Sequence, residues 1–167
     1  MSARAAWRLE QLGFERVYDY VASKSDWFAC GMPREGAAAD VPWAGDLVSD
    51  DAPTCALDDR VGEVRERVLA SGYDFCVVVN EERVILGLLR GDALSKDEKA
   101  RADEVMELGP KTTPPSEPVE ELLQARSSQG VKNFLVATSH GVLLGALSRD
   151  DAERALAKQE SEQNGNG

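Results

Sequence analysis

The sequence is poor in the residues on which most catalytic and metal sites depend. Among its 167 residues there is one histidine, His140, which excludes a site built on several histidines. The three cysteines, Cys30, Cys55 and Cys76, are odd in number and lack Cys-x-x-Cys spacing, so neither a disulfide framework nor a zinc knuckle is expected. We expect reduced thiols in or near the core of a cytoplasmic protein.

Basic charge and long apolar runs are also scarce. The chain has 19 Lys and Arg against 30 Asp and Glu, a formal net charge of −11, which argues against a nucleic-acid or anionic-membrane partner. No apolar run approaches the ~20 residues that span a bilayer, and the N-terminus has no continuous apolar segment typical of a signal peptide. A 43% hydrophobic chain of this length predicts one compact domain, or two small ones that share a core.

Sequence signatures of catalysis are missing as well. The chain has no Gly-x-Ser-x-Gly, no P-loop and no Gly-x-Gly-x-x-Gly, and His140 falls in a predicted hairpin turn. Paired acidic residues occur at or near predicted helix starts, where the helix dipole favours them as caps. These pairs are Asp50-Asp51, Asp58-Asp59 and Asp150-Asp151. We therefore expect no catalytic residues, no metal site and no enzyme activity.

What the sequence does contain is an internal repeat. At an offset of 58 residues, the separation of Gly87 from Gly145, a long block aligns with itself without a gap. The matched pairs are Thr54 with Thr112, Gly72 with Gly130, Val78 with Val136, Leu86 with Leu144, Leu89 with Leu147, and Asp92 with Asp150. Two copies of one unit are therefore predicted, at 44–97 and 98–158.

Each copy has the pattern of a β-α-β-β-α unit. In the second copy we expect an extended start at 112–113, a helix capped by Ser116, strands at 134–137 and 142–147 around a turn, and a helix from 149 to about 158. The first copy predicts a helix over 60–70 capped by Asp58 or Asp59, then strands at 75–79 and 84–89. Short, almost wholly apolar strands are typical of sheets covered on both faces, so the two copies are predicted to pack sheet against sheet in a mixed α/β (α+β) fold.

A tandem of such units, each with a Leu-Gly-x-Leu strand that leads into a helix, resembles a pair of cystathionine-β-synthase (CBS) domains. The residues that carry the resemblance are Leu86 to Leu89 and Leu144 to Asp151. It implies a pseudo-twofold pair, or Bateman module, with clefts between the copies. Modules of this family often bind adenosine-containing ligands in those clefts and often form homodimers.

The second copy also resembles the family's nucleotide-binding pattern, Gly-h-h-(Ser/Thr)-x-x-Asp, where h is an apolar residue. Ser148 would cap the last helix and, with Arg149, offer donors to a phosphate, while Asp151 would accept hydrogen bonds from ribose hydroxyls. Four further residues are candidates in the same cleft: Thr112, Thr113, Lys132 and Asn133. The resemblance thus implies a regulatory sensor for an AMP-, ADP- or ATP-like ligand that needs no cofactor.

The same motif supports a ligand-free alternative. Ser-x-x-Asp at a helix start is close to a capping box, which stabilises a helix by itself, so the pair of repeats would then serve only dimerisation or interaction. In the first copy Arg90 replaces Ser148 and Ala93 replaces Asp151. Thr54, Arg90 and Asp92 therefore define a candidate second cleft that departs from the nucleotide-binding pattern.

Residues 1–36 lie outside the repeat. They predict a helix ended by Gly13, a strand over 14–18 and a helical stretch over 27–30. The run Leu12 to Tyr18, followed by Trp27 and Gly31-Met32-Pro33, resembles the C-terminal end of a rhodanese-like domain. That resemblance implies a sulfurtransferase-related origin, whose cysteine loop would precede Met1; Cys30 lies at the wrong end of the motif.

The remaining segments connect or extend these units. Residues 37–43 are predicted to be a linker and 159–167 a disordered tail. The aromatic side chains near the N-terminus need a partner surface, and we expect them to pack on the repeat pair or across a dimer. They are Trp7, Phe14, Tyr18, Tyr20, Trp27 and Trp43.

Overall fold

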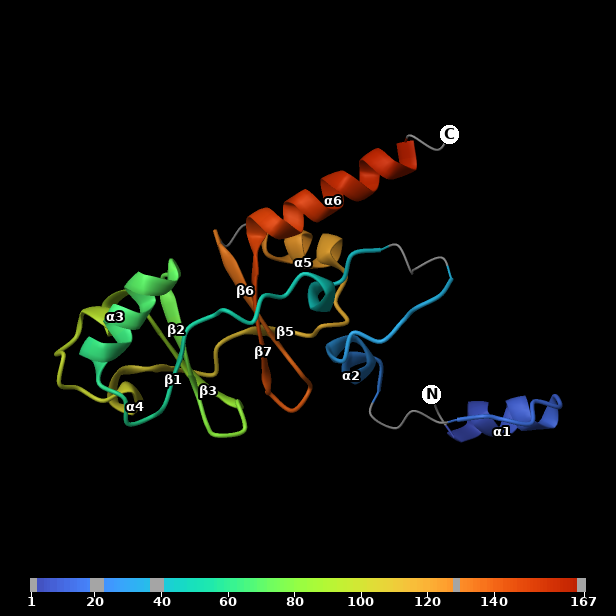
Figure 1. Cartoon of the computed structure of the whole chain (residues 1–167), viewed down its shortest axis with the longest axis horizontal. Helices are drawn as coiled ribbons and strands as arrows, with labels where there is room; N and C mark the ends of the chain where they lie inside the picture. Colours follow the sequence, from blue (N-terminus) through green and yellow to red (C-terminus); the bar gives the residue numbers. More distant parts are fainter. Residues whose placement is uncertain (1–2, 19–22, 37–40, 128–129, 165–167) are drawn as a thin grey trace.

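The computed structural model describes residues 3–18, 23–36, 41–127 and 130–164. Two lobes, each a small sheet with its helices, lie side by side, and α1 lies away from both (Figure 1). The elements before the repeats are α1 (Ala3–Gln11), α2 (Ser23–Ala29) and the 3₁₀ helix η1 (Ala44–Asp46). Within the described ranges, no helix combines the length and apolar character needed to cross a bilayer.

The first lobe contains a four-stranded sheet in the order β1-β2-β3-β4. Its elements are β1 (Thr54–Cys55), α3 (Val61–Ser71), β2 (Phe75–Val79), β3 (Ile85–Arg90), η2 (Gly91–Ser95), α4 (Ala102–Val105) and β4 (Glu107–Leu108). β1 runs parallel to β2, and the other neighbours are antiparallel.

The second lobe has a three-stranded sheet in the order β5-β6-β7. Its elements are β5 (Thr112–Thr113), α5 (Val119–Ala125), β6 (Asn133–Ala137), β7 (Leu143–Ser148) and α6 (Arg149–Asn164). The pairing follows that of the first lobe, including a register shift at Val136/Ala137 that matches the one at Val78/Val79. The predicted repeat, its offset and its mixed α/β class are confirmed.

The two copies exchange their leading segments. Ala44 begins the first copy but is fully buried in the core of the second lobe, against Val119 and Leu122. Ala102, its equivalent at the repeat offset, is fully buried in the core of the first lobe, against Val64. In Figure 1 the helix that contains Ala102, α4, accordingly lies beside α3.

Main-chain hydrogen bonds hold both exchanged segments in the same way. The Ala44 N–H donates to the Glu117 carbonyl at 2.9 Å, and the Ala102 N–H donates to the Asp59 carbonyl at 2.9 Å. These acceptors lie just before α5 and α3. The helices therefore begin after Pro118 and Arg60, their N-cap residues, and the predicted caps at Ser116 and at Asp58 or Asp59 are wrong.

A third apolar cluster joins the sheets to each other. From the first lobe it takes Ala52, Phe75, Val77 and Leu88, and from the second Leu135, Leu143 and Ala146. The hairpin tips also meet, because the Ile85 N–H donates to the Gly141 carbonyl and the Leu143 N–H donates to the Arg83 carbonyl, both at 2.9 Å. The predicted sheet-on-sheet packing is confirmed.

Three sequence expectations differ from the structure. Residues 14–18 form no strand, because no neighbouring strand among the described residues pairs with them. The helix expected after β3 is only the 3₁₀ helix η2, since Gly91 has φ +50° and Arg90 supplies no side-chain cap. Helix α6 passes the expected end near 158 and runs to Asn164, so residues 159–164 are helical rather than disordered.

The N-terminal aromatic side chains divide into two groups. Phe28 packs on Trp43 with ring centroids 4.7 Å apart, and the Trp27 indole N–H donates to the Pro33 carbonyl. Trp7, Phe14 and Tyr18 are largely exposed, so these three do not pack on the repeat pair, and their packing across a dimer stays a prediction. Tyr20 lies outside the described residues, as does most of the predicted 37–43 linker.

The three cysteines differ in their exposure to solvent. Cys55 and Cys76 are buried in the core of the first lobe, as expected, whereas Cys30 is exposed. Contact with the Cys55 thiol, together with burial, raises the pKa of Cys76, so this group stays a neutral thiol.

The glycine of each Leu-Gly-x-Leu strand lies beneath a crossing segment of the chain. Ser49 exchanges two 2.9 Å main-chain hydrogen bonds with Ala146, next to Gly145, and Glu107 of β4 pairs in the same way with Leu88, next to Gly87. A Cβ at Gly145 would collide with the Ser49 carbonyl, and φ there is +150°. A Cβ at Gly87 would meet chiefly the flexible Met106 side chain.

We expect Gly145→Ala to lower the free energy of unfolding by about 3 kcal/mol or more, because a rigid backbone oxygen and an unfavourable φ oppose the methyl group. Gly87→Ala, the matched substitution at the repeat offset, should lower it by only about 1–2 kcal/mol. Urea unfolding of both variants measures the difference. Equal losses would show that the crossing over Gly145 is as adaptable as the one over Gly87.

Candidate functional site: the Arg90 cleft

Three adjoining cavities meet at Arg90, the last residue of β3. Their volumes are about 220, 410 and 730 Å³, and Arg90 lines all of them. The first two lie between the lobes, since Leu88 and Arg90 of the first copy face Val131, Asn133 and Leu135 of the second. The third extends along η2, past Asp92 and Lys96. We call this set of cavities the Arg90 cleft.

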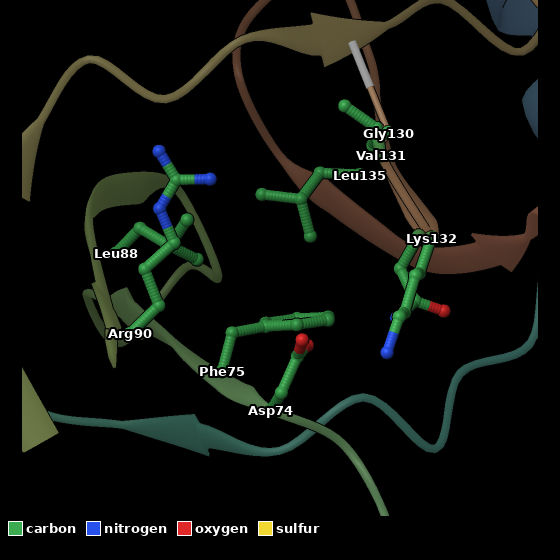
Figure 2. Close-up of a pocket in the computed structure, with 9 residues that line it drawn as sticks. Asp74, Phe75, Leu88, Arg90, Gly130, Val131, Lys132 and Leu135 are labelled. Carbon is green, nitrogen blue, oxygen red and sulfur yellow. The ribbon is translucent and has the colours of Figure 1, made fainter.

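The floor of the Arg90 cleft is apolar and its rim is charged. Figure 2 shows Leu135 over the Phe75 ring, with Arg90 on one side and Lys132 on the other. Phe75, Leu88 and Leu135 are buried, at 6–7% exposure, because they also belong to the cluster between the sheets. Such a floor accommodates a flat ring, while the rim can hold polar or charged substituents.

Basic side chains gather around this floor in a strongly acidic protein. The two inter-lobe cavities are lined by Arg90, Lys111, Arg126 and Lys132, against the acidic Asp74 and Glu107. The chain as a whole has the opposite balance, with a net charge of −11. The local excess of basic groups favours an anionic ligand.

Arg90 has an internal partner. Its guanidinium forms a fork with the Glu107 carboxylate, with Nε–Oε2 at 3.1 Å and Nη2–Oε2 at 2.9 Å. Both side chains are more than half exposed, so the pair contributes at most about 1 kcal/mol. An anion entering the cleft would compete with Glu107 for Arg90.

The predicted site residues Ser148 and Asp151 are used in capping α6. The Asp151 N–H donates to Ser148 Oγ at 3.1 Å, and Ser148 Oγ donates to the Asp151 carboxylate at 2.6 Å. Arg154 also pairs with this carboxylate at 3.0 Å, but the Asp151 side chain is still half exposed. The geometry matches the capping alternative and leaves part of Asp151 accessible.

Arg149 holds the chain that leads into β6. Its Nε donates to the Val131 carbonyl at 2.8 Å and one terminal nitrogen donates to the Arg126 carbonyl at 2.9 Å. The guanidinium also lies over the Phe134 ring, 5.5 Å from its centroid. These contacts orient Arg149 toward the protein rather than toward a ligand.

The other predicted residues fall into two groups. Lys132, Asn133 and Asp92 line the Arg90 cleft together with Arg90 itself. Thr54, Thr112 and Thr113 are not among the described residues that line it. Thr113 is 1% exposed, and its hydroxyl has no hydrogen-bond partner among the described residues.

Tyr73 was missed by the sequence analysis. Its hydroxyl donates to the Asp51 carboxylate at 2.6 Å, and its ring packs edge-on against Phe75 with centroids 5.2 Å apart. Burial, and then the hydrogen bond to Asp51, raises the pKa of Tyr73 to about 12, while the same bond lowers the pKa of Asp51. An alignment of the two copies would have identified Tyr73, because it corresponds there to the much smaller Val131.

By sequence, the chain matches no protein-family profile and no curated protein. Its structure, however, matches solved structures. It covers 98% of the CBS-pair protein CBSX2 from Arabidopsis thaliana, with 72% of this chain aligned, 15% identity and a TM-score of 0.64. The fold is that of a CBS domain pair.

Two further likenesses involve bound ligands. The cytosolic domain of the Mg²⁺ channel MgtE, solved with ATP, aligns with 71% of this chain at 21% identity and a TM-score of 0.61. The CBS pair of protein MJ0100, solved with 5′-methylthioadenosine and S-adenosyl-L-methionine, aligns with 71% at 17% identity and a TM-score of 0.58. The chain spans about half of MgtE's domain and of the soluble part of a magnesium transporter, 51% and 48% respectively.

The buried hydroxyl of Thr113 leads to a prediction about stability. Thr113→Val replaces an unpartnered hydroxyl by a methyl group, so we expect the free energy of unfolding to rise by about 1 kcal/mol. Thr112→Val, on the exposed neighbour, should change it by less than about 0.5 kcal/mol. Urea unfolding measures both, and a loss of stability in Thr113→Val would show that the hydroxyl has a partner.

The Tyr73–Asp51 hydrogen bond makes a pH prediction. Because the folded-state pKa of Tyr73 is raised to about 12, its contribution to stability is complete below the unfolded pKa near 10 and is lost as the pH rises toward 12. Between pH 9 and pH 11.5, the free energy of unfolding should fall more steeply for wild type than for Tyr73→Phe. Parallel decreases in urea unfolding would contradict this assignment.

Proposed function

We propose that this CBS pair is a regulatory module that binds an adenine nucleotide in the Arg90 cleft. The observation that supports it most directly is an apolar floor ringed by four basic side chains in a chain of net charge −11. A purine ring would lie on Phe75 and Leu135, and the phosphates would reach Arg90 and the basic side chains of the neighbouring cavity. The adenosine ligands of the MgtE and MJ0100 structures are consistent with this class.

The ligand would thus lie in the cleft that departs from the sequence motif and not in the cleft that the motif favoured. Arg90 stands where the motif has Ser148, and it offers a guanidinium fork in place of a hydroxyl. Asp92, one position short of the motif aspartate, lines the same cleft and is the available acceptor for ribose hydroxyls. Arg90 and Asp92 would together supply the phosphate donor and the ribose acceptor that the motif assigns to serine and aspartate.

The regulatory role follows from where the ligand would lie. Glu107, which pairs with Arg90, belongs to β4, which pairs with β3 of the first lobe and leads into β5 of the second. A phosphate that takes Arg90 from Glu107 would loosen β4 from β3, so ligand binding would change the connection between the lobes. Such differential binding to two arrangements is what a sensor requires.

We expect Arg90→Ala to weaken ATP binding by about 10- to 100-fold, since it removes a charge-assisted contact to phosphate. Glu107→Gln should tighten binding by up to about fivefold, because it removes the competing carboxylate from an exposed pair. Isothermal titration with ATP, AMP and S-adenosylmethionine measures both effects and ranks the ligands.

Arg101→Ala is the matched control. Arg101 is an exposed arginine paired with Asp103 at 3.1 Å, and it does not line the Arg90 cleft. Its loss lowers the net positive charge by the same amount, so binding should stay within about twofold of wild type. Equal losses in Arg90→Ala and Arg101→Ala, or no binding of any of the three ligands to wild type, would contradict the proposal.

An interaction module is the second candidate function. The exposed Trp7, Phe14 and Tyr18 favour it, as does the use of Ser148 and Asp151 in capping. In that case the chain would be unaffected by all three ligands.

A further inference from the structure

The pseudo-twofold symmetry predicts a second cleft, related to the first by the repeat offset. The Arg90 cleft is formed by the end of β3 and by residues 130–133 of the other copy. The equivalent elements are the end of β7, at Ser148, and residues 72–75. We call the space between them the Ser148 cleft.

Tyr73 and Asp51 bridge the mouth of the Ser148 cleft. Tyr73 lies just before β2, and its hydroxyl donates to Asp51 at 2.6 Å. Asp51 comes two residues after Ser49, which is hydrogen-bonded to Ala146 of β7. The tyrosine side chain therefore reaches from one wall of the cleft to the segment that covers the other, and the negative charge of Asp151 acts on it.

The two residues equivalent to this pair line the open cleft instead. At the repeat offset Tyr73 corresponds to Val131 and Asp51 to Gly109. Val131 and Gly109 both line the cavity of about 410 Å³ beside Arg90. Neither has a polar side-chain atom, so the hydrogen bond that joins Tyr73 to Asp51 has no counterpart there.

The packing around Tyr73 keeps its side chain in place. The ring lies edge-on to Phe75, and Tyr73 is partly buried against the cluster between the sheets. The hydrogen bond from Tyr73, and then the Ser49 side chain, lower the pKa of Asp51, so the acceptor stays charged. Ring packing thus fixes the donor end of the bridge, and the charge of Asp51 favours the acceptor end.

We propose that Tyr73 and Asp51 form a latch that closes the Ser148 cleft, so that each chain binds one nucleotide, at Arg90, and not two. The inference rests on the proposed function for the ligand class and adds the residues that decide between the two clefts. Ser148 and Asp151 then define a latent site whose access Tyr73 controls.

The test is the number of ATP molecules bound per chain, measured by isothermal titration of the full-length protein. The double variant Tyr73→Val/Asp51→Gly gives the Ser148 cleft the two residues that line the open one. We expect wild type to bind one equivalent and the double variant to bind two. In the double variant, adding Asp151→Ala should remove the second equivalent, and adding Arg90→Ala should remove the first.

A second measurement leaves the latch intact and does not depend on how well the double variant folds. Arg90→Ala in the wild-type background should lose binding by at least tenfold and retain no other site. If it retains one equivalent that Asp151→Ala removes, the Ser148 cleft is open and the latch is overturned. Two equivalents on wild type, or a folded double variant that still binds only the one equivalent dependent on Arg90, would overturn it as well.

Failure of the proposed function gives a different result. Wild type that binds no ATP, with a double variant that binds one equivalent dependent on Asp151, would refute the Arg90 site and support the latch. Tyr73→Phe separates the hydrogen bond from the ring, since it keeps the aromatic contact with Phe75. One equivalent in Tyr73→Phe and two in the double variant would assign closure to the bulk of the ring.

Discussion

Each lobe of this protein depends on the other for the last part of its core. The exchanged segments place Ala44 and Ala102 at full burial in the lobe opposite to their own copy, and matched main-chain hydrogen bonds hold them there. Alanine suits this position because a small side chain lets a short helix approach the neighbouring helix closely. The exchange ties the two sheets together and fixes the space between them.

The same exchange determines what lines the clefts. A segment that leaves an exchanged helix must return across the sheet to begin its own copy, and it does so over Gly145 in one case and over Gly87 in the other. The first crossing leads to Asp51, within reach of Tyr73, and the second places Glu107 on Arg90. The main chain repeats in the two copies up to the ends of β3 and β7. Beyond them η2 follows one strand and α6 the other, and the side chains around the two clefts differ as well.

Local sequence patterns were sufficient to predict the strands of the two copies and the offset between them. The apolar runs at 75–79 and 134–137 are strands, and the offset of Gly87 from Gly145 is the offset of the fold. The wrong predictions concern residues whose structure depends on contacts with segments that are distant in the sequence. The N-cap residues of α3 and α5 were misplaced, because carbonyls at Asp59 and Glu117 accept hydrogen bonds from the exchanged segments, which no local pattern reveals. The strand predicted at 14–18 has the right composition, but no strand in the described part of the chain pairs with it.

The candidate site was only partly predictable for the same reason. A local motif identified Ser148 and Asp151, and the structure shows them in a helix cap that such a motif also encodes. Arg149 matched the pattern by position, yet main-chain carbonyls engage it. Which cleft is open depends on Tyr73 in one copy and Val131 in the other. These two side chains differ in size, and neither belongs to a recognised motif. Comparing the copies residue by residue identifies that difference.

The exchange of Ala44 and Ala102 has a consequence for the origin of the chain. A polypeptide with a single copy would have one leading helix and one core position that such a helix must fill. In the exchanged arrangement its own helix could not fill that position. Two identical chains would satisfy each other by reciprocal exchange, as in a domain-swapped homodimer. The internal repeat is consistent with an origin of that kind by duplication, since the present arrangement has the geometry of such a dimer within one polypeptide. The two halves are separate in sequence and can change independently, so a tyrosine can occupy one half where the other has valine.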